Sequence, residues 1–162
     1  MKRTLTLSAL AALGITAQAQ MAPWSVAPDF TANDINGVSQ HLYSYLDQGY
    51  TVILDISAAW CGPCWNYHSS GALEDLYNTY GPGTQENKVM VLFVEGEGTN
   101  TIDQLNGITT AQTYAGFSQG DWVTGTPYPI IDNASIASSY QISYFPTIYK
   151  ICPNRIVSEV GQ

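Results

Sequence analysis

Two runs of apolar residues most constrain what this chain of 162 residues can fold into: residues 51–57 (TVILDIS) and residues 88–94 (KVMVLFV). Continuous apolar runs of this length are typical of strands that are buried on both faces, as in a parallel sheet. Between them, residues 65–80 place leucines and tyrosines at three- and four-residue spacing, which predicts a helix, with a kink at residues 69–71 (SSG). A strand, a helix and a second strand form a parallel crossover unit, so we expect an α/β domain.

Shorter patterns complete the expected architecture. Turn-forming residues 33–37 separate two candidate strands at 29–32 and 38–42, which predicts an N-terminal hairpin. Residues 147–152 and 155–160 predict a second, antiparallel hairpin near the end of the sequence. The remaining expected elements are short helices at 41–46, 109–117 and 135–141, a polar, glycine-rich loop at 95–107 and a short strand at 130–132.

The first 19 residues have the composition of a secretory signal peptide. Lys2 and Arg3 give a positive start, residues 4–16 are mostly small and apolar, and residues 17–19 (Ala-Gln-Ala) form a small-x-small cleavage site. The apolar stretch is short for a membrane span, and no cysteine follows it to accept a lipid. We therefore expect an exported protein, periplasmic or secreted, with no stable membrane insertion after the signal is removed. The expected division is a signal peptide at 1–19, a lead-in linker at 20–27 and one domain at 28–162.

The charge balance excludes two classes of partner. The formal net charge is −8, and without the signal peptide only Lys88, Lys150 and Arg155 remain against 13 acidic residues. Nucleic acids and anionic membranes are bound through basic patches, so neither is expected as a partner.

Two of the three cysteines, Cys61 and Cys64, stand two residues apart in the stretch AAWCGPCW. Outside the cytoplasm they could pair, and the pair could be a metal half-site, a structural staple or a redox couple. A tetrahedral zinc site needs four ligands, and no second CxxC or HxxxH pair supplies them, so no metal is expected. A staple across so small a loop removes little chain entropy. Cys152 is left over as an odd thiol, either free and buried or engaged in an intermolecular bond.

A redox couple explains more of the pattern. Cys61 falls where a buried strand ends and a helix begins, and the backbone N–H groups at a helix start stabilise a thiolate. Cys61 is then the exposed nucleophile, while Cys64, one turn into the helix, is more buried and resolves the mixed disulfide. Gly62 allows a close approach, and Pro63 suits the first turn of a helix.

Residues 60–64 (WCGPC) resemble the active-site motif of the thioredoxin superfamily. Pro146, between Phe145 and Thr147, resembles that family's cis-proline signature. The resemblance implies a three-layer sandwich in which Pro146 faces the cysteine pair across the site. It also implies a reversible Cys61–Cys64 disulfide and no cofactor.

Residues 27–30 (APDF) and 34–37 (DING) resemble the N-terminal hairpin of the exported TlpA-like branch of this superfamily and of peroxiredoxins. Residues 95–144 fit the additional strand and helix that the TlpA-like branch inserts. A peroxiredoxin is disfavoured, because Leu54 and Ala58 stand where that family has proline and threonine. We expect a thioredoxin-like sandwich with an N-terminal β-hairpin and a central insertion. The family's final helix is missing from the sequence, and an uncovered last strand suggests a longer natural chain.

Asp55 lies six residues before Cys61, at the position of a buried acid in thioredoxin. Burial in an apolar strand should raise the pKa of this carboxyl group, and such an acid can accept and return a proton of a neighbouring thiol. The alternative is a carboxylate satisfied by local hydrogen bonds. No lysine lies within residues 90–94, where a partner for this acid is expected. Trp60 either shields the site or packs in the core.

Other polar and aromatic residues have plainer interpretations. His68 is expected to be a helix-surface or packing residue, and residues 95–98 (EGEG) a solvated loop. The aromatic residues that either line a peptide groove or pack on the sheet are Tyr128, Tyr140, Tyr144 and Tyr149.

The sequence thus predicts an exported thiol–disulfide oxidoreductase, leaning toward reduction. Its partners would be protein or peptide disulfides and an electron donor that the sequence does not identify. The alternative is a redox-inert module of the same fold that binds partners through an acidic, tyrosine-rich surface.

Overall fold

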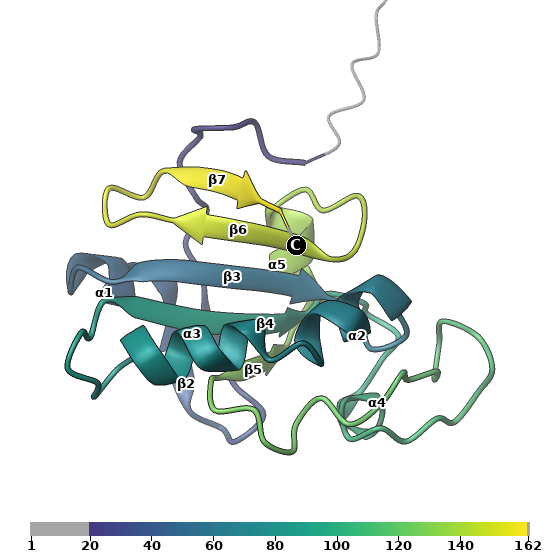
Figure 1. Ribbon diagram of the computed structural model, residues 1–162. Coiled ribbons are helices and arrows are strands. Elements are labelled where there is room, and N and C mark those ends of the chain that lie inside the picture. The colour runs from purple at the N-terminus through teal and green to yellow at the C-terminus, as the bar shows by residue number, and fades with distance from the viewer. Residues whose placement is uncertain (1–19, 162) are drawn as a thin grey trace, which may run out of the picture.

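The two apolar runs form the centre of a five-stranded sheet in the computed structural model, which describes residues 20–161. β3 (Thr51–Ser57) and β4 (Val89–Glu95) pair in parallel over their whole lengths, from Thr51 opposite Val89 to Ser57 opposite Glu95. The predicted crossover unit is therefore confirmed, and both strands end at the same edge of the sheet (Figure 1). The expected signal peptide at residues 1–19 lies outside the described residues.

The outer strands extend the sheet in the order β5-β4-β3-β6-β7. β5 pairs in parallel with β4, whereas β6 pairs antiparallel with both β3 and β7. The predicted N-terminal hairpin is also present, as a separate two-stranded sheet. The bounds are β1 Thr31–Asn33, β2 Ser39–His41, β5 Ile130–Asp132, β6 Thr147–Ile151 and β7 Val157–Val160.

Helices cover both faces of the sheet, which gives the three layers that the sequence predicts. On β3, Val52, Leu54 and Ile56 face one apolar cluster, which includes buried residues of α1 (Leu42–Asp47) and α5 (Ala134–Ser139). The opposite face of the sheet contributes Val91 and Phe93 to a second cluster, beneath the helices that follow β3. This division follows from the alternation of side chains along a strand. The two cysteines of the CxxC motif belong to the second cluster.

The helix predicted over residues 65–80 is two helices. α2 (Gly62–His68) carries the CxxC motif, and α3 (Ala72–Tyr80) follows after a break at Ser69–Gly71. Gly71 has φ of +77°, a left-handed conformation that glycine adopts without strain and that no helix interior contains. The predicted kink is thus a complete interruption, and α2 and α3 run along the same face of the sheet (Figure 1).

The segment between β4 and β5 differs most from the sequence-based expectation. Residues 95–107 contain a short helix, α4 (Ile102–Leu105), begun by a capping box of Thr101 and Gln104. The prediction of a helix over residues 109–117 is wrong. The chain turns there instead, with the Thr110 and Ala111 N–H groups both donating to the Gly116 carbonyl oxygen. Two local features explain why no helix forms. The threonines in this stretch disfavour a helix, and Gly116 adopts φ of +94°, which lies outside the helical region.

The lead-in segment is hydrogen-bonded to the domain. The Trp24 N–H donates to the Val157 carbonyl, the Val157 N–H to that of Ser25, and the Ala27 N–H to that of Arg155. The lead-in therefore pairs with the first part of β7, whose edge the sequence suggests would be uncovered. Among residues 20–161, no helix is long and apolar enough to cross a membrane.

A single glycine controls how the segment between β4 and β5 docks on α2. A Cβ atom at Gly120 would lie 2.4 Å from Cζ2 of Trp65, which is too close for any real contact. We predict that Gly120→Ala lowers the free energy of unfolding by roughly 1–3 kcal/mol, as overpacking does in other proteins. Urea unfolding monitored by circular dichroism measures this.

The matched control is Gly98→Ala in the same segment. Its Cβ atom would lie 3.5 Å from that of Ala134, an ordinary contact, so its stability should stay near that of the wild type. Equal stabilities of the two variants would contradict the proposed close packing.

Candidate active site

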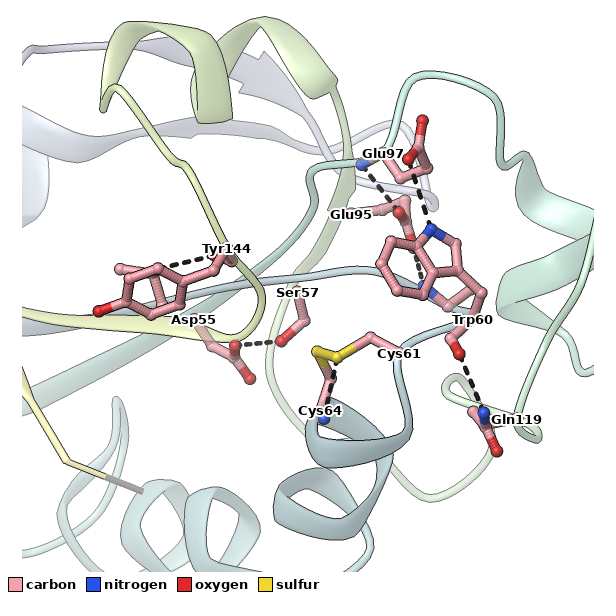
Figure 2. The surroundings of a disulfide bond; sticks show 11 residues. Asp55, Ser57, Trp60, Cys61, Cys64, Glu95, Glu97, Gln119 and Tyr144 are labelled. Atoms are coloured by element: carbon pink, nitrogen blue, oxygen red, sulfur yellow. Dashed lines mark hydrogen bonds between the residues drawn. A yellow bond between two sulfur atoms is a disulfide. The ribbon is translucent and has the colours of Figure 1, made fainter. Parts of the chain in front are cut away.

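The CxxC motif forms a disulfide at the start of α2. β3 ends at Ser57, and the next residues form a turn that is closed by a 2.9 Å hydrogen bond from the Cys61 N–H to the Ala58 carbonyl. Cys61 is the N-cap of α2, and its Sγ accepts the Cys64 N–H at 3.2 Å. The two sulfur atoms are bonded at 2.04 Å (Figure 2). The sequence therefore folds locally so that a strand end, a turn and a helix start converge on Cys61.

Gly62 and Pro63 are the first two residues of the helix. The N–H groups of a first helical turn have no partner within the helix, so proline removes nothing there, and Pro63 is exposed.

The prediction that Cys61 is exposed is wrong for the disulfide form. Cys61 is 2% exposed and Cys64 1% exposed, so burial does not distinguish the two residues. The physical reason is that the surrounding segments pack closely on the turn that precedes Cys61. Gln119 donates its backbone N–H to the Ala59 carbonyl and its side-chain amide to the Trp60 carbonyl, both at 2.9 Å.

Trp60 is half-buried and connects three parts of the chain. Its ring lies 4.4 Å from that of Tyr114 and 6.0 Å from that of Phe145, measured between ring centroids. Its Nε1–H donates to Glu97 at 3.4 Å (Figure 2). Because Tyr114 is 68% exposed, the indole and this tyrosine form an aromatic surface beside the disulfide. Trp60 also packs against the second apolar cluster, so both interpretations, shielding and core packing, remain.

The Phe145–Pro146 peptide bond is cis. Pro146 is buried and directly precedes β6, whose first residue, Thr147, pairs with Ile56 near the end of β3. The Thr147 hydroxyl donates to the Tyr144 carbonyl at 2.9 Å, which fixes the loop that carries the proline. The fold thus brings Phe145 against Trp60, at the end of the sheet where the cysteines lie.

Asp55 is 1% exposed and lies on β3. Burial raises the pKa of its carboxyl group to about 7, although the Ser57 hydroxyl, which donates to it at 2.6 Å, opposes part of the shift. The predicted direction of this shift is confirmed. Both sequence-based interpretations remain, because the carboxyl group has a local hydrogen bond and also has a pKa suited to proton transfer near neutral pH.

Glu95 is a further buried acid that the sequence analysis assigns to a solvated loop, which is wrong. It is the last residue of β4, is 0% exposed, and accepts N–H groups from Ala59 at 2.8 Å and Glu97 at 2.9 Å (Figure 2). Burial raises the pKa of its carboxyl group to about 8. The apolar run at residues 88–94 stops one residue short of it, and only the register of β4 on β3 places Glu95 opposite Ser57.

The remaining candidate residues lie apart from the disulfide or pack in the core. His68 is 7% exposed and packs 4.9 Å from Trp122, and burial lowers its pKa, so it is a packing residue. Cys152 is a free thiol and half-buried, rather than buried as expected. Of the four tyrosines considered for a groove, only Tyr144 is exposed, so they do not line one together.

No group of three or more histidine, cysteine, aspartate or glutamate side chains within residues 20–161 is placed to hold a metal ion.

Comparisons with known proteins agree with this geometry. No family model matches the chain. The thiol-disulfide oxidoreductase ResA of Geobacillus thermodenitrificans is 28% identical over 170 residues, which cover 99% of this chain and 84% of that protein. The thioredoxin domain of a Bacteroides vulgatus thiol-disulfide oxidoreductase superposes with a TM-score of 0.58 at 21% identity, covering 88% of this chain and 90% of that one. A thiol-disulfide oxidoreductase from Bacteroides fragilis superposes with a TM-score of 0.60 at 16% identity, covering 85% and 91%.

The fold is that of the thioredoxin superfamily, as the two superpositions and the sheet order show. Together with the paired CxxC motif and the similarity to ResA, this fold makes the chain similar to redoxin-type, thioredoxin-like disulfide oxidoreductases.

The raised pKa of Asp55 predicts how stability depends on pH. The unfolded carboxyl group ionises near pH 4 and the folded one near 7, so the wild type loses stability as the pH rises between these values. We predict that Asp55→Asn, which keeps an oxygen to accept the Ser57 hydroxyl, is more stable than the wild type at about pH 8, by roughly 2–4 kcal/mol. Urea unfolding of the oxidised protein at several pH values measures this difference, which should vanish toward about pH 4.

Glu86→Gln is the control, because Glu86 pairs with Lys88 at the surface. It should change stability little at any pH. A difference between Asp55→Asn and the wild type that does not depend on pH would rule out a neutral Asp55 in the folded state.

Proposed function

We propose that this protein is an exported thiol–disulfide oxidoreductase that reduces disulfide bonds of protein or peptide substrates. The observation that carries the proposal is the Cys61–Cys64 disulfide at the start of α2, with the Cys64 N–H directed at the Cys61 sulfur. The same N–H would stabilise a thiolate on Cys61 in the dithiol form, because a charged acceptor strengthens the hydrogen bond. The N-terminal end of α2 adds a favourable dipole.

The reaction consists of two thiol–disulfide exchanges. The Cys61 thiolate attacks one sulfur of a substrate disulfide, forms a mixed disulfide and releases the other substrate sulfur as a thiolate, which takes up a proton. The Cys64 thiol then loses its proton and attacks the Cys61 sulfur, which releases the second substrate thiolate and restores the Cys61–Cys64 disulfide. Two electrons pass from the cysteine pair to the substrate.

Asp55 is proposed to accept the Cys64 proton. The support is its burial, its position on the strand that leads into the site and its pKa of about 7, which allows it to take up and return a proton near neutral pH. Trp60, Phe145 and Pro146 are proposed to shape the surface that the substrate contacts. A dithiol donor has to reduce the Cys61–Cys64 disulfide between turnovers.

Export is supported by the signal-peptide composition of residues 1–19.

A second candidate is a redox-inert binding module of the same fold. One observation favours it, namely that both cysteines are buried, so their sulfurs offer little surface to a reactant. The exposed Tyr114 and Tyr144 would then belong to the binding surface.

Insulin reduction by dithiothreitol separates the two candidates. We predict that the wild type accelerates the reaction, that Cys61→Ser abolishes the acceleration because the nucleophile is lost, and that Cys152→Ser retains it. Insulin precipitation followed by turbidity is the measurement. Correctly folded wild-type protein without any acceleration would favour the binding module.

The roles of the two cysteines are tested by trapping. Cys64→Ala lacks the resolving thiol and should accumulate a mixed disulfide through Cys61, detected by mass spectrometry of peptides. A mixed disulfide through Cys152 instead would show that the assignment is wrong.

A further inference from the structure

Glu95 lies where three structural segments meet. It ends β4, where it pairs with Ser57 of β3 on one side and Asp132 of β5 on the other. Its side chain is fully buried, and each carboxyl oxygen accepts a different backbone N–H, Oε2 that of Ala59 and Oε1 that of Glu97. A buried acid is unfavourable unless its oxygens have partners, and here both partners are backbone groups of fixed position.

One of these partners belongs to the turn that delivers the nucleophile. Ala59 is the second residue of the turn from Ala58 to Cys61, which the Cys61 N–H closes. The Ala59 N–H donates to the Glu95 carboxyl group, and the Ala59 carbonyl accepts the Gln119 N–H. The turn is therefore hydrogen-bonded on one side to Glu95 of the sheet and on the other to Gln119 of the segment between β4 and β5.

We propose that Glu95 is a positioning residue for disulfide exchange, whose carboxyl group fixes Ala59 and through it the placement of Cys61. This inference rests on the proposed function, because it concerns the same cysteine pair. Figure 2 shows the Glu95 carboxyl group directed at the turn between Trp60 and the strand end. Its two hydrogen bonds go to backbone N–H groups, so we assign it no direct chemical step.

The electrostatic surroundings of Glu95 make the strength of its hydrogen bond with the Ala59 N–H depend on pH. The acidic groups nearest to it are Asp132 on β5 and Glu97 in the following loop, and both raise its pKa, as burial does more strongly. Asp55 on β3 is a further carboxyl group at this end of the sheet. The ionised form satisfies two N–H donors on two oxygens, whereas a proton on one oxygen leaves a weaker acceptor. The turn is therefore held more firmly as the pH rises through about 8.

A pH titration of the amide resonances tests the contact directly. In the oxidised wild type, the chemical shifts of the Ala59 and Glu97 amide protons should change together as the pH passes through about 8, since both protons are donated to the same carboxyl group. In Glu95→Gln neither chemical shift should change in this pH range. Independent shifts of the two amides, or none, would overturn the inference, whether or not the protein reduces any substrate.

The functional consequence is tested by the rate at which dithiothreitol reduces the Cys61–Cys64 disulfide. In Glu95→Gln one N–H loses its acceptor, because the new amide group is itself a donor. Above about pH 8, where the wild-type Glu95 is ionised, the rate constant should fall about tenfold, which corresponds to the loss of one hydrogen bond to a charged group. After correction for the thiolate fraction of dithiothreitol, its pH profile should also lose the step that the wild type shows near 8. A purely structural role would lower stability without removing this step.

Asp132→Asn is the matched control. It removes a neighbouring carboxylate that makes no hydrogen bond to the turn, so its rate constant should stay within about twofold of the wild type. In this variant the chemical-shift change of the Ala59 and Glu97 amides should occur at a lower pH, because a negative neighbour that raises the pKa of Glu95 has been removed. Equal rate constants and profiles for Glu95→Gln and the wild type would overturn the inference.

If Glu95→Gln does not fold, Glu95→Asp serves as the second variant. It keeps the charge but shortens the side chain, so it should keep a titration step and lose rate. A wild type that is reduced normally but does not accelerate insulin reduction would contradict the proposed function and leave these results on Glu95 valid.

Discussion

The parallel pairing of β3 with β4 is the constraint on which the rest of the site depends. The two strands begin and end together, so Ser57 and Glu95 lie side by side at one edge of the sheet. That edge is where the chain leaves β3 for the turn into α2, and where it leaves β4 for the inserted segment. β6 adds the third component, because its antiparallel register starts at Thr147 and places the cis-proline at the same end. Three segments that are distant in sequence thus meet around one disulfide.

This convergence has an energetic consequence, since two carboxyl groups are buried near the ends of β3 and β4. The pKa values of Asp55 and Glu95 are both raised, mainly by burial, to about 7 and about 8. The two acids differ in their partners, since Asp55 accepts a side-chain hydroxyl and Glu95 accepts backbone N–H groups. We interpret Asp55 as the group suited to exchange protons and Glu95 as the group suited to hold the backbone.

The local pattern of apolar residues is sufficient to predict the strands that form the core. The bounds of β3 agree residue for residue with the prediction, because a mainly apolar run of this length, with five of its seven residues buried in the structure, is typical of a central strand. The CxxC motif at a helix start and the C-terminal hairpin were likewise readable from the sequence. The segment between β4 and β5 was not, because tertiary contacts such as Gly120 against Trp65 determine its path. Glu95 was misassigned for a related reason: glycines on its C-terminal side signal a loop, and only pairing with β3 shows that the strand continues to Glu95.

The location of Cys152 determines which disulfides one molecule can form. Cys152 follows the end of β6 that pairs with Val52, so most of the length of β3 separates it from the turn that carries Cys61. At about 3.3 Å per residue, five residues of strand span roughly 16 Å, far beyond the Cα separation of about 7 Å that a disulfide tolerates. Internal scrambling among the three cysteines is therefore sterically forbidden in the folded chain. The protein can cycle between its oxidised and reduced forms with a third thiol present and still return to the same pairing each time.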